Sequence, residues 1–294
     1  MTAIEVEGLS KSYGGRRGIS NVSFAVGEGA LFGFIGPNGA GKTTTIRILL
    51  GLLRQDAGHA RLFGVDVATD GPRARASVGY VPSETNLYPR MRVSELLDYT
   101  GRFHDGDHVA RRRELVERLE LDTSVRASEL SLGNRKKVAI VAALQHRPRL
   151  AILDEPSTGL DPVMQARLHD VLREEVTRGA SVFFSSHMLA EVQSVCKQVA
   201  IVREGKLLAV EDIAALRSRA VRRVRLTFAG EIPPILLDGM DGLAREGQTV
   251  TFVYAGHAPT LLAALARAAP ADVTIEEPSL DDIFLRYYAE SSDA

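Results

Sequence analysis

The sequence has only one cysteine, Cys196. A single thiol cannot form an internal disulfide, and it cannot supply a cysteine zinc cluster. This usage fits a reducing cytoplasm. Cys196 follows apolar residues at helical spacing, so we expect it to be a small core residue.

Long apolar runs and an excess of one charge are lacking as well. No apolar run approaches the roughly 18 residues that a membrane span needs, and the first residues lack the pattern of a signal peptide. The 36 basic and 37 acidic side chains give a net charge of -1, which offers no bulk electrostatic basis for binding nucleic acid. Any role at a membrane must therefore come through a partner or through surface docking.

A phosphate-binding loop is the clearest feature that the sequence does have. Residues 36–43 read GPNGAGKT, which matches the pattern G-x-x-x-x-G-K-[ST]. The apolar run 31–35 predicts a buried strand before it, and 44–53 predicts a helix after it. Glycines let backbone N–H groups turn towards phosphates, and the helix adds the positive end of its dipole.

Within this loop we expect Lys42 to reach the β- and γ-phosphates of a nucleotide. Thr43 is expected to hold Mg²⁺ through its hydroxyl group. The predicted nucleotide-binding residues of the loop are Gly36, Pro37, Asn38, Gly39, Ala40, Gly41, Lys42, Thr43 and Thr44.

Strands and helical patterns alternate over the first two thirds of the chain, which predicts a mainly parallel α/β core. After about residue 218 the composition changes, and a small α+β domain is expected. Strands are predicted in this domain at 224–228, 250–254 and 273–275, and helices at 261–269 and 280–288. Its glycines at 239, 242 and 247 are expected to lie in turns.

Two carboxylates follow the apolar strand predicted at 150–153. An acid at the end of such a strand lies beside the nucleotide and organises Mg²⁺, a role that fits Asp154. Glu155 can orient a water in line with the γ-phosphate. An apolar strand that ends in Asp-Glu is also common at surface turns, and the phosphate-binding loop upstream favours the functional interpretation.

A second candidate anion site is the segment 130–134, LSLGN, which opens a predicted helix and is called the signature segment below. One nucleotide does not need two such sites from one chain. We therefore expect Ser131 and Gly133 to face a nucleotide that a second copy holds. The alternative is that Ser131 is a plain helix cap.

In this order, the motifs resemble those of ABC transporter ATP-binding subunits. The resemblance implies that Tyr13 stacks on adenine, that Ser131 and Gly133 complete the partner's site, and that the loop 157–161 communicates across a dimer. It also implies that His187 contacts the γ-phosphate. Without the resemblance, Tyr13 would be a strand-edge residue, and His187 would be a capping or surface residue.

The resemblance covers 4–210 and implies the fold class: α/β, with a P-loop ABC-type ATPase core, a helical subdomain and a small C-terminal α+β domain. The expected domain boundaries are 1–218 for the ATPase, with the helical subdomain at about 84–147, and 219–294 for the accessory domain.

The chain departs from the family pattern at two places. The signature segment has Asn134 where the commonest form has glutamine, although Ser131 and Gly133 remain. After GYVP at 79–82, the family usually has a glutamine that touches Mg²⁺, and this chain has Ser83. The expected metal ligands are therefore Thr43 and Asp154, with Ser83 as a weak candidate.

The motifs GYVPSE and EPSLDDIF (277–284) resemble ATPases of bacterial drug, bacitracin or polyketide exporters. The resemblance implies an ATPase that uses ATP and Mg²⁺ and works as a homodimer with a separately encoded transmembrane permease. It implies a place on the cytoplasmic face of the cell membrane and no nucleic-acid partner.

The alternative is a soluble ABC-type ATPase that acts on nucleic acid or ribosomes. The chain lacks the long insertions and the second ATPase core that such proteins carry. A P-loop kinase or GTPase outside this family is disfavoured by the signature segment, by His187 and by the lack of an N-K-x-D motif.

Overall fold

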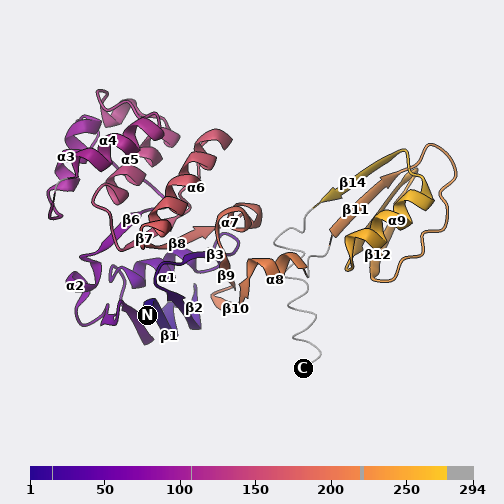
Figure 1. The fold of residues 1–294 in the computed structure, drawn as a ribbon. Helices are drawn as coiled ribbons and strands as arrows, with labels where there is room; N and C mark the ends of the chain where they lie inside the picture. The colour runs from indigo at the N-terminus through magenta and orange to yellow at the C-terminus, as the bar shows by residue number, and fades with distance from the viewer. Residues whose placement is uncertain (15, 107, 219–221, 277–294) are drawn as a thin grey trace. The chain divides into compact units, whose positions relative to one another are not determined.

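The computed structural model describes residues 1–14, 16–106, 108–218 and 222–276. It divides into two compact units, Met1–Asp212 and Ile213–Ala294 (Figure 1). No helix in the described part of the chain combines the length and the apolar character that crossing a bilayer requires.

A six-stranded sheet forms the centre of the first unit, in the order β10-β9-β3-β8-β7-β6. Five of its strands run parallel, namely β9, β3, β8, β7 and β6. The remaining strand of this sheet, β10, is antiparallel. The strands are β3 (Leu31–Ile35), β6 (Val78–Val81), β7 (Leu150–Asp154), β8 (Ser181–Ser186), β9 (Gln198–Arg203) and β10 (Lys206–Asp212). The predicted mainly parallel α/β core is therefore present.

A second, antiparallel sheet in this unit has the order β2-β1-β4-β5. Its strands are β1 (Thr2–Tyr13), β2 (Arg16–Gly27), β4 (Ala57–Leu62) and β5 (Val65–Asp66). Phe24 of β2 packs against Phe32 and Phe34 of β3 and Phe183 of β8, with ring centroids 5.4–5.9 Å from it. The main core therefore lies between the two sheets, where these rings are removed from water.

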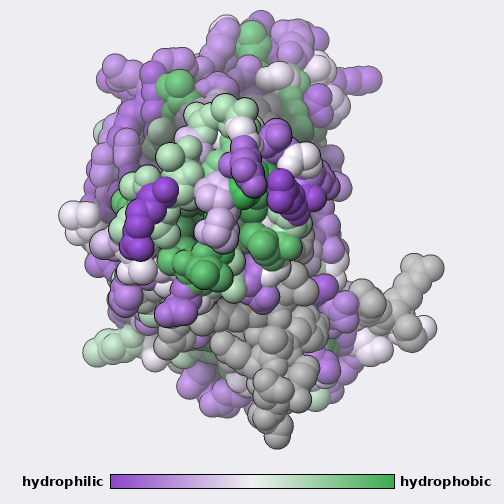
Figure 2. Space-filling model, turned by 90° about the vertical axis from the view of Figure 1, so that its right-hand side faces the viewer, coloured by the Kyte–Doolittle hydropathy of each residue, from purple (hydrophilic) through white to green (hydrophobic). Residues whose placement is uncertain are grey.

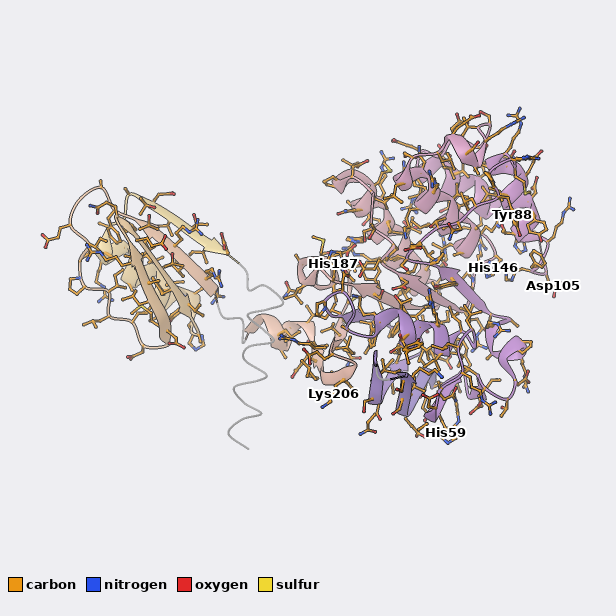
Figure 3. The ribbon with its side chains drawn as sticks, turned by 180° about the vertical axis from the view of Figure 1, so that it is seen from behind. His59, Tyr88, Asp105, His146, His187 and Lys206 are labelled. Atoms are coloured by element: carbon orange, nitrogen blue, oxygen red, sulfur yellow. The ribbon has the colours of Figure 1, made fainter. Side chains whose placement is uncertain are left out.

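Helices complete the first unit, and α3, α4 and α5 gather on one side of it, beside α6 (Figure 1). Figure 3 shows His146 in this helical part and His187 at the end of β8. The helices are α1 (Lys42–Leu49), α2 (Gly71–Arg75), α3 (Val93–Gly101), α4 (Val109–Arg118), α5 (Leu132–Leu144), α6 (Pro162–Thr177) and α7 (Leu189–Val195), with a 3₁₀ turn at Ala127–Glu129.

The structure confirms one expectation about this unit and contradicts another. Cys196 is buried as predicted, and burial raises the pKa of its thiol. The helix predicted at 44–53 instead begins at Lys42 and ends at Leu49, so that prediction was wrong at both ends. Beyond Leu50 the chain turns, with Gly51 at a φ of +60°, a conformation that glycine adopts without strain.

The second unit begins with α8 (Ile213–Ser218) and contains a four-stranded antiparallel sheet in the order β12-β13-β11-β14. Its other elements are β11 (Arg222–Thr227), β12 (Met240–Glu246), β13 (Thr249–Tyr254), α9 (Ala258–Ala268) and β14 (Asp272–Glu276). Alternate residues of β11 and β13, such as Val224 and Phe252, form a separate core with Leu261 and Leu265 of α9.

Strand β12 was not predicted, and Gly242 lies within it rather than in a turn. The helix predicted at 280–288 falls outside the described residues. Leu236, Leu243 and Leu262 of the second unit are exposed, and Figure 2 shows such apolar residues scattered among hydrophilic ones on the face that it presents.

Candidate functional site

The phosphate-binding loop leaves the carboxyl end of β3 and enters α1. Gly39 and Gly41 have φ values of +80° and +103°, which side chains with a Cβ rarely adopt. A Cβ on Gly36 would lie 2.2 Å from the carbonyl oxygen of Val202, so no larger residue fits there. The loop conformation therefore explains three of the glycines in the motif.

Lys42, the first residue of α1, is 6% exposed and bends back over the loop. Its Nζ donates to the carbonyl oxygens of Gly36, at 2.7 Å, and Pro37, at 3.3 Å. The same Nζ lies 3.2 Å from Oε1 of Glu155. The ammonium thus has partners on the loop and on the end of β7.

Asp154 ends β7 and is completely buried. Thr43 donates its hydroxyl hydrogen to Oδ2 at 2.9 Å, and Ser185 of β8 donates to Oδ1 at 2.6 Å. Burial, together with the charge of Asp154, raises the pKa of Tyr80 to about 12. Two hydroxyl groups, one from α1 and one from the neighbouring strand β8, therefore fix the orientation of this carboxylate.

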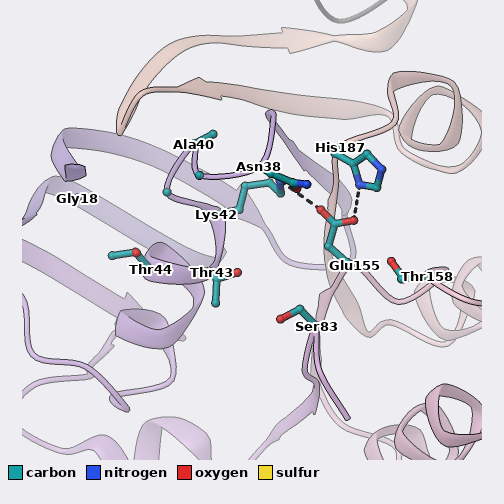
Figure 4. A pocket seen from close by; sticks show the side chains of 12 residues that line it. Gly18, Asn38, Ala40, Lys42, Thr43, Thr44, Ser83, Glu155, Thr158 and His187 are labelled. Atoms are coloured by element: carbon teal, nitrogen blue, oxygen red, sulfur yellow. Dashed lines mark hydrogen bonds and ion pairs between the residues drawn. The ribbon is translucent and has the colours of Figure 1, made fainter. Parts of the chain in front are cut away.

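Glu155 has a φ of +51°, which is uncommon for a residue with a side chain. Its Oε2 lies 2.6 Å from Nδ1 of His187, while its Oε1 contacts Lys42. Its backbone N–H donates to the hydroxyl of Ser185 at 3.2 Å. One carboxylate therefore bridges the loop lysine and the histidine that follows β8 (Figure 4).

These groups meet because β3, β7 and β8 are parallel neighbours that end at the same edge of the sheet. Ligands of open α/β sheets bind at this carboxyl edge. A cavity of about 490 Å³ opens there (Figure 4). It is lined by Gly18, Asn38, Gly39, Ala40, Gly41, Lys42, Thr43, Thr44, Ser83, Glu155, Thr158 and His187.

Ten of the residues predicted for the site line this cavity, namely 38–44, Ser83, Glu155 and His187. Asp154 is not part of the lining, but it accepts a hydrogen bond from Thr43, which is. Tyr13 is 40% exposed, and its hydroxyl oxygen lies 3.5 Å from that of Thr44. The structure therefore places Tyr13 next to the loop.

Ser131 and Gly133 are not part of the lining of this cavity. Ser131 caps α5 by accepting a hydrogen bond from the backbone N–H of Asn134 at 3.2 Å. A Cβ on Gly133 would lie 2.4 Å from the carbonyl oxygen of Gly159. The signature segment therefore packs against the loop 157–161, apart from the chain's own phosphate-binding loop.

Sequence reasoning assigned the cavity-lining residue Thr158 only to the loop that communicates across a dimer, and it missed two other residues of the site. Gly18 lines the cavity, and a Cβ there would lie 1.7 Å from the carbonyl oxygen of Lys11. Ser185 of β8 was not predicted as a site residue, yet its hydroxyl group donates to Asp154. No local motif marks either residue, because the fold brings both to the site from other strands.

The residues at this edge fit a magnesium ion bound with a phosphate. Mg²⁺ uses hydroxyl and carboxylate oxygens together with phosphate and water. Thr43 and Asp154 supply such oxygens in direct contact, and the hydroxyl of Ser83 belongs to the same cavity. Among the described residues, no group of three or more His, Cys, Asp or Glu side chains could hold a metal ion. A metal ion at this edge would therefore need oxygens of phosphate or water as further ligands.

Known proteins are similar to this chain in sequence. A family model described as ABC transporter matches residues 19–158. Nod factor export ATP-binding protein I of Paraburkholderia xenovorans (strain LB400) is 35% identical over 294 residues, covering 97% of this chain and 96% of that protein. Linearmycin resistance ATP-binding protein LnrL of Bacillus subtilis (strain 168) is 29% identical over 302 residues, covering 96% and 97%.

Solved structures give the same match for the fold. A structure described as the ATP binding subunit of an ABC transporter has a TM-score of 0.69 and 31% identity, covering 74% of this chain and 92% of that chain. A dimeric bacterial ABC transporter cassette has a TM-score of 0.65 at 20% identity, covering 71% of this chain and 98% of the other.

Proposed function

Because this chain belongs to the family of ABC transporter ATP-binding subunits, we propose that it drives export by a separate transmembrane permease on which two copies act head to tail. The chain is an ABC transporter ATPase. The observation that carries the proposal is the meeting of Lys42, Thr43, Glu155 and His187 at one cavity on the carboxyl edge of the sheet.

ATP enters this cavity with its phosphates against the loop 36–43. The backbone N–H groups of the loop, the start of α1 and Lys42 neutralise the phosphate charge. Tyr13, beside Thr44, stacks on the adenine. Thr43 and Asp154 hold Mg²⁺, which neutralises charge that develops on the phosphates during hydrolysis.

Glu155 positions the attacking water, and His187 holds Glu155 and contacts the γ-phosphate. Glu155 contacts both Lys42 and His187 in this structure. A phosphate competes with Glu155 for the ammonium of Lys42, because both are anions. Binding of ATP therefore releases Oε1 of Glu155 to accept a hydrogen bond from water.

The second copy supplies its signature segment to the γ-phosphate. Ser131 and Gly133 lie at the N-terminus of α5, a helix of 13 residues, and lie outside the lining of their own cavity. A helix N-terminus attracts anions. The match to a dimeric cassette of the same fold supports this arrangement. ATP then stabilises the closed pair, and hydrolysis removes the shared contact.

Export is supported by the relatives, which are named for Nod factor export and linearmycin resistance and align over nearly the whole chain. We infer a cargo of the kind that such exporters carry, a drug, an antibiotic or a similar compound. The chain acts at the cytoplasmic face of the membrane, where the permease converts closing of the pair into transport.

Replacing Glu155 by glutamine tests this reaction scheme. The E155Q chain should bind ATP, turn it over at least about a hundredfold more slowly than wild type and accumulate as a dimer, because the water is no longer oriented. Phosphate release and light scattering after gel filtration measure the two effects.

The matched control is K42A, which removes the phosphate-binding ammonium and should lose both ATP binding and the dimer. Wild-type turnover by E155Q would remove Glu155 from the reaction. Full ATP affinity in K42A would remove Lys42 from phosphate binding.

A further inference from the structure

Lys136 is a buried cation that the reaction scheme above does not use. It lies in the second turn of α5 and is only 1% exposed. Its Nζ donates to the carbonyl oxygen of Pro82 at 2.9 Å and to that of Ser83 at 2.7 Å. A buried lysine is rare, so these two hydrogen bonds to neutral carbonyl groups need an explanation.

The two carbonyl groups belong to the chain that leaves β6, where Ser83 turns into the nucleotide cavity. An ammonium has three donors and no acceptor, so it can hold two successive carbonyl groups at once. A glutamine has two N–H donors, but its side chain is shorter and carries no charge, and a methionine of similar length has no donor. Lysine is therefore suited to fix this turn of the backbone.

The charge of Lys136 is compatible with its position. Burial lowers the pKa of its ammonium, while the nearby negative charges of Asp154 and Glu155 act in the opposite direction. The two short contacts to carbonyl oxygens require the N–H donors of the side chain. The cation thus lies between the loop after β6 and the carboxylates that end β7.

The first two turns of α5 link Lys136 to the signature segment. Ser131 caps this helix, and Gly133 lies in its first turn, three residues before Lys136. A helix moves as a rigid body, so a displacement of its first turn also displaces its second turn. Lys136, in the second turn, carries this displacement to the backbone of Ser83 through its hydrogen bond. The signature segment and the cavity of the same chain are therefore connected through one side chain.

We propose that Lys136 is a positioning residue of the ATPase reaction, which holds the loop at Pro82 and Ser83 in place beside Glu155 and ties it to the signature segment. The effect on turnover rests on the proposed function, whereas the effect on the loop does not. Lys136 is not among the residues that line the cavity, so its removal should lower kcat and leave ATP binding by the loop 36–43 intact.

A tryptophan reporter tests the effect on the loop directly. The chain has no tryptophan, and Glu84 is exposed next to Ser83, so E84W gives a single fluorophore in this loop. Adding K136M should raise acrylamide quenching about twofold and lower fluorescence anisotropy, because the loop loses its anchor. K136Q should have a smaller effect. R113Q, which removes an exposed cation from α4, should have none.

Steady-state kinetics of the full chain give the second readout. K136M should lower kcat about tenfold and change KM for ATP less than about twofold, with K136Q between K136M and wild type. Far-UV circular dichroism and thermal unfolding verify that each variant is folded. A residue that only stabilised the fold would change KM and the melting temperature together.

Equal quenching in E84W with and without K136M would overturn the proposal, because the loop would then be held by something else. An unchanged kcat in K136M would overturn the role in the reaction. A wild-type chain without any turnover would instead contradict the proposed function, and the quenching comparison would still decide whether Lys136 holds the loop.

Discussion

At the scale of single residues, close contacts explain why certain positions hold glycine. Gly133 is one of them, since a Cβ there would meet the carbonyl oxygen of Gly159 at 2.4 Å. An approach under 3 Å forces one of the two groups to move. The oxygen belongs to the backbone and the Cβ is attached to it, so neither can move aside as the end of a flexible side chain can. Gly133 therefore fixes the contact between the signature segment and the loop 157–161.

Replacing Gly133 by alanine should separate hydrolysis from binding. G133A moves the signature segment, so we expect ATP turnover to fall about a hundredfold, a typical cost of misplacing a reacting group by about 1 Å. Binding of ATP to the isolated chain should stay unchanged, since Gly133 is not part of its own cavity. Calorimetric titration with ATP and phosphate release measure the two.

The control for this variant is G230A in the second unit, where nothing lies within 4 Å of an added Cβ. G230A should match wild type in both assays. Wild-type turnover in G133A would show that the signature segment does not need its contact with Gly159.

At the scale of elements, buried charge joins the helical part of the first unit to the core. Arg111 of α4 and Glu175 of α6 are each 2% exposed and form an ion pair. Arg111 also contacts Glu114, and Arg178 reaches Glu175 at 3.1 Å. Removing one partner of a buried pair leaves an uncompensated charge, which costs more than the pair contributes.

The variant E175Q should therefore lower the free energy of unfolding of the first unit by about 3 kcal/mol. Urea denaturation followed by circular dichroism measures this change. The exposed pair of Arg167 and Glu120 provides the control, since E120Q should cost less than about 1 kcal/mol. Equal effects of the two variants would contradict the structural role of the buried pair.

Elements also differ in how well the sequence predicts them. Strand β3 was predicted with its exact bounds and β7 to within one residue, because the residues predicted for them are apolar and buried. Strand β12 escaped prediction because six of its seven residues are exposed, and Gly242 has a φ of +62°. Exposure on both faces removes the alternation from which strands are recognised.

At the scale of the whole molecule, the motifs and their order predicted the fold class and the ABC ATPase activity, and both are confirmed. They could not predict Gly18, which reaches the cavity from β2, or Ser185, which reaches Asp154 from β8, because both come into place only after the sheets have formed. The roles of Ser131 and Gly133 stay predictions, because they depend on a second copy of the chain.

The proposed partner of this ATPase is a membrane permease. A pull-down of the tagged E155Q chain, with ATP, from gently solubilised native membranes tests whether the two proteins associate. Mass spectrometry should identify a protein with several membrane spans, and K42A should recover less of it. Recovery of only soluble proteins or nucleic acid would contradict the transporter role and leave the ATPase standing.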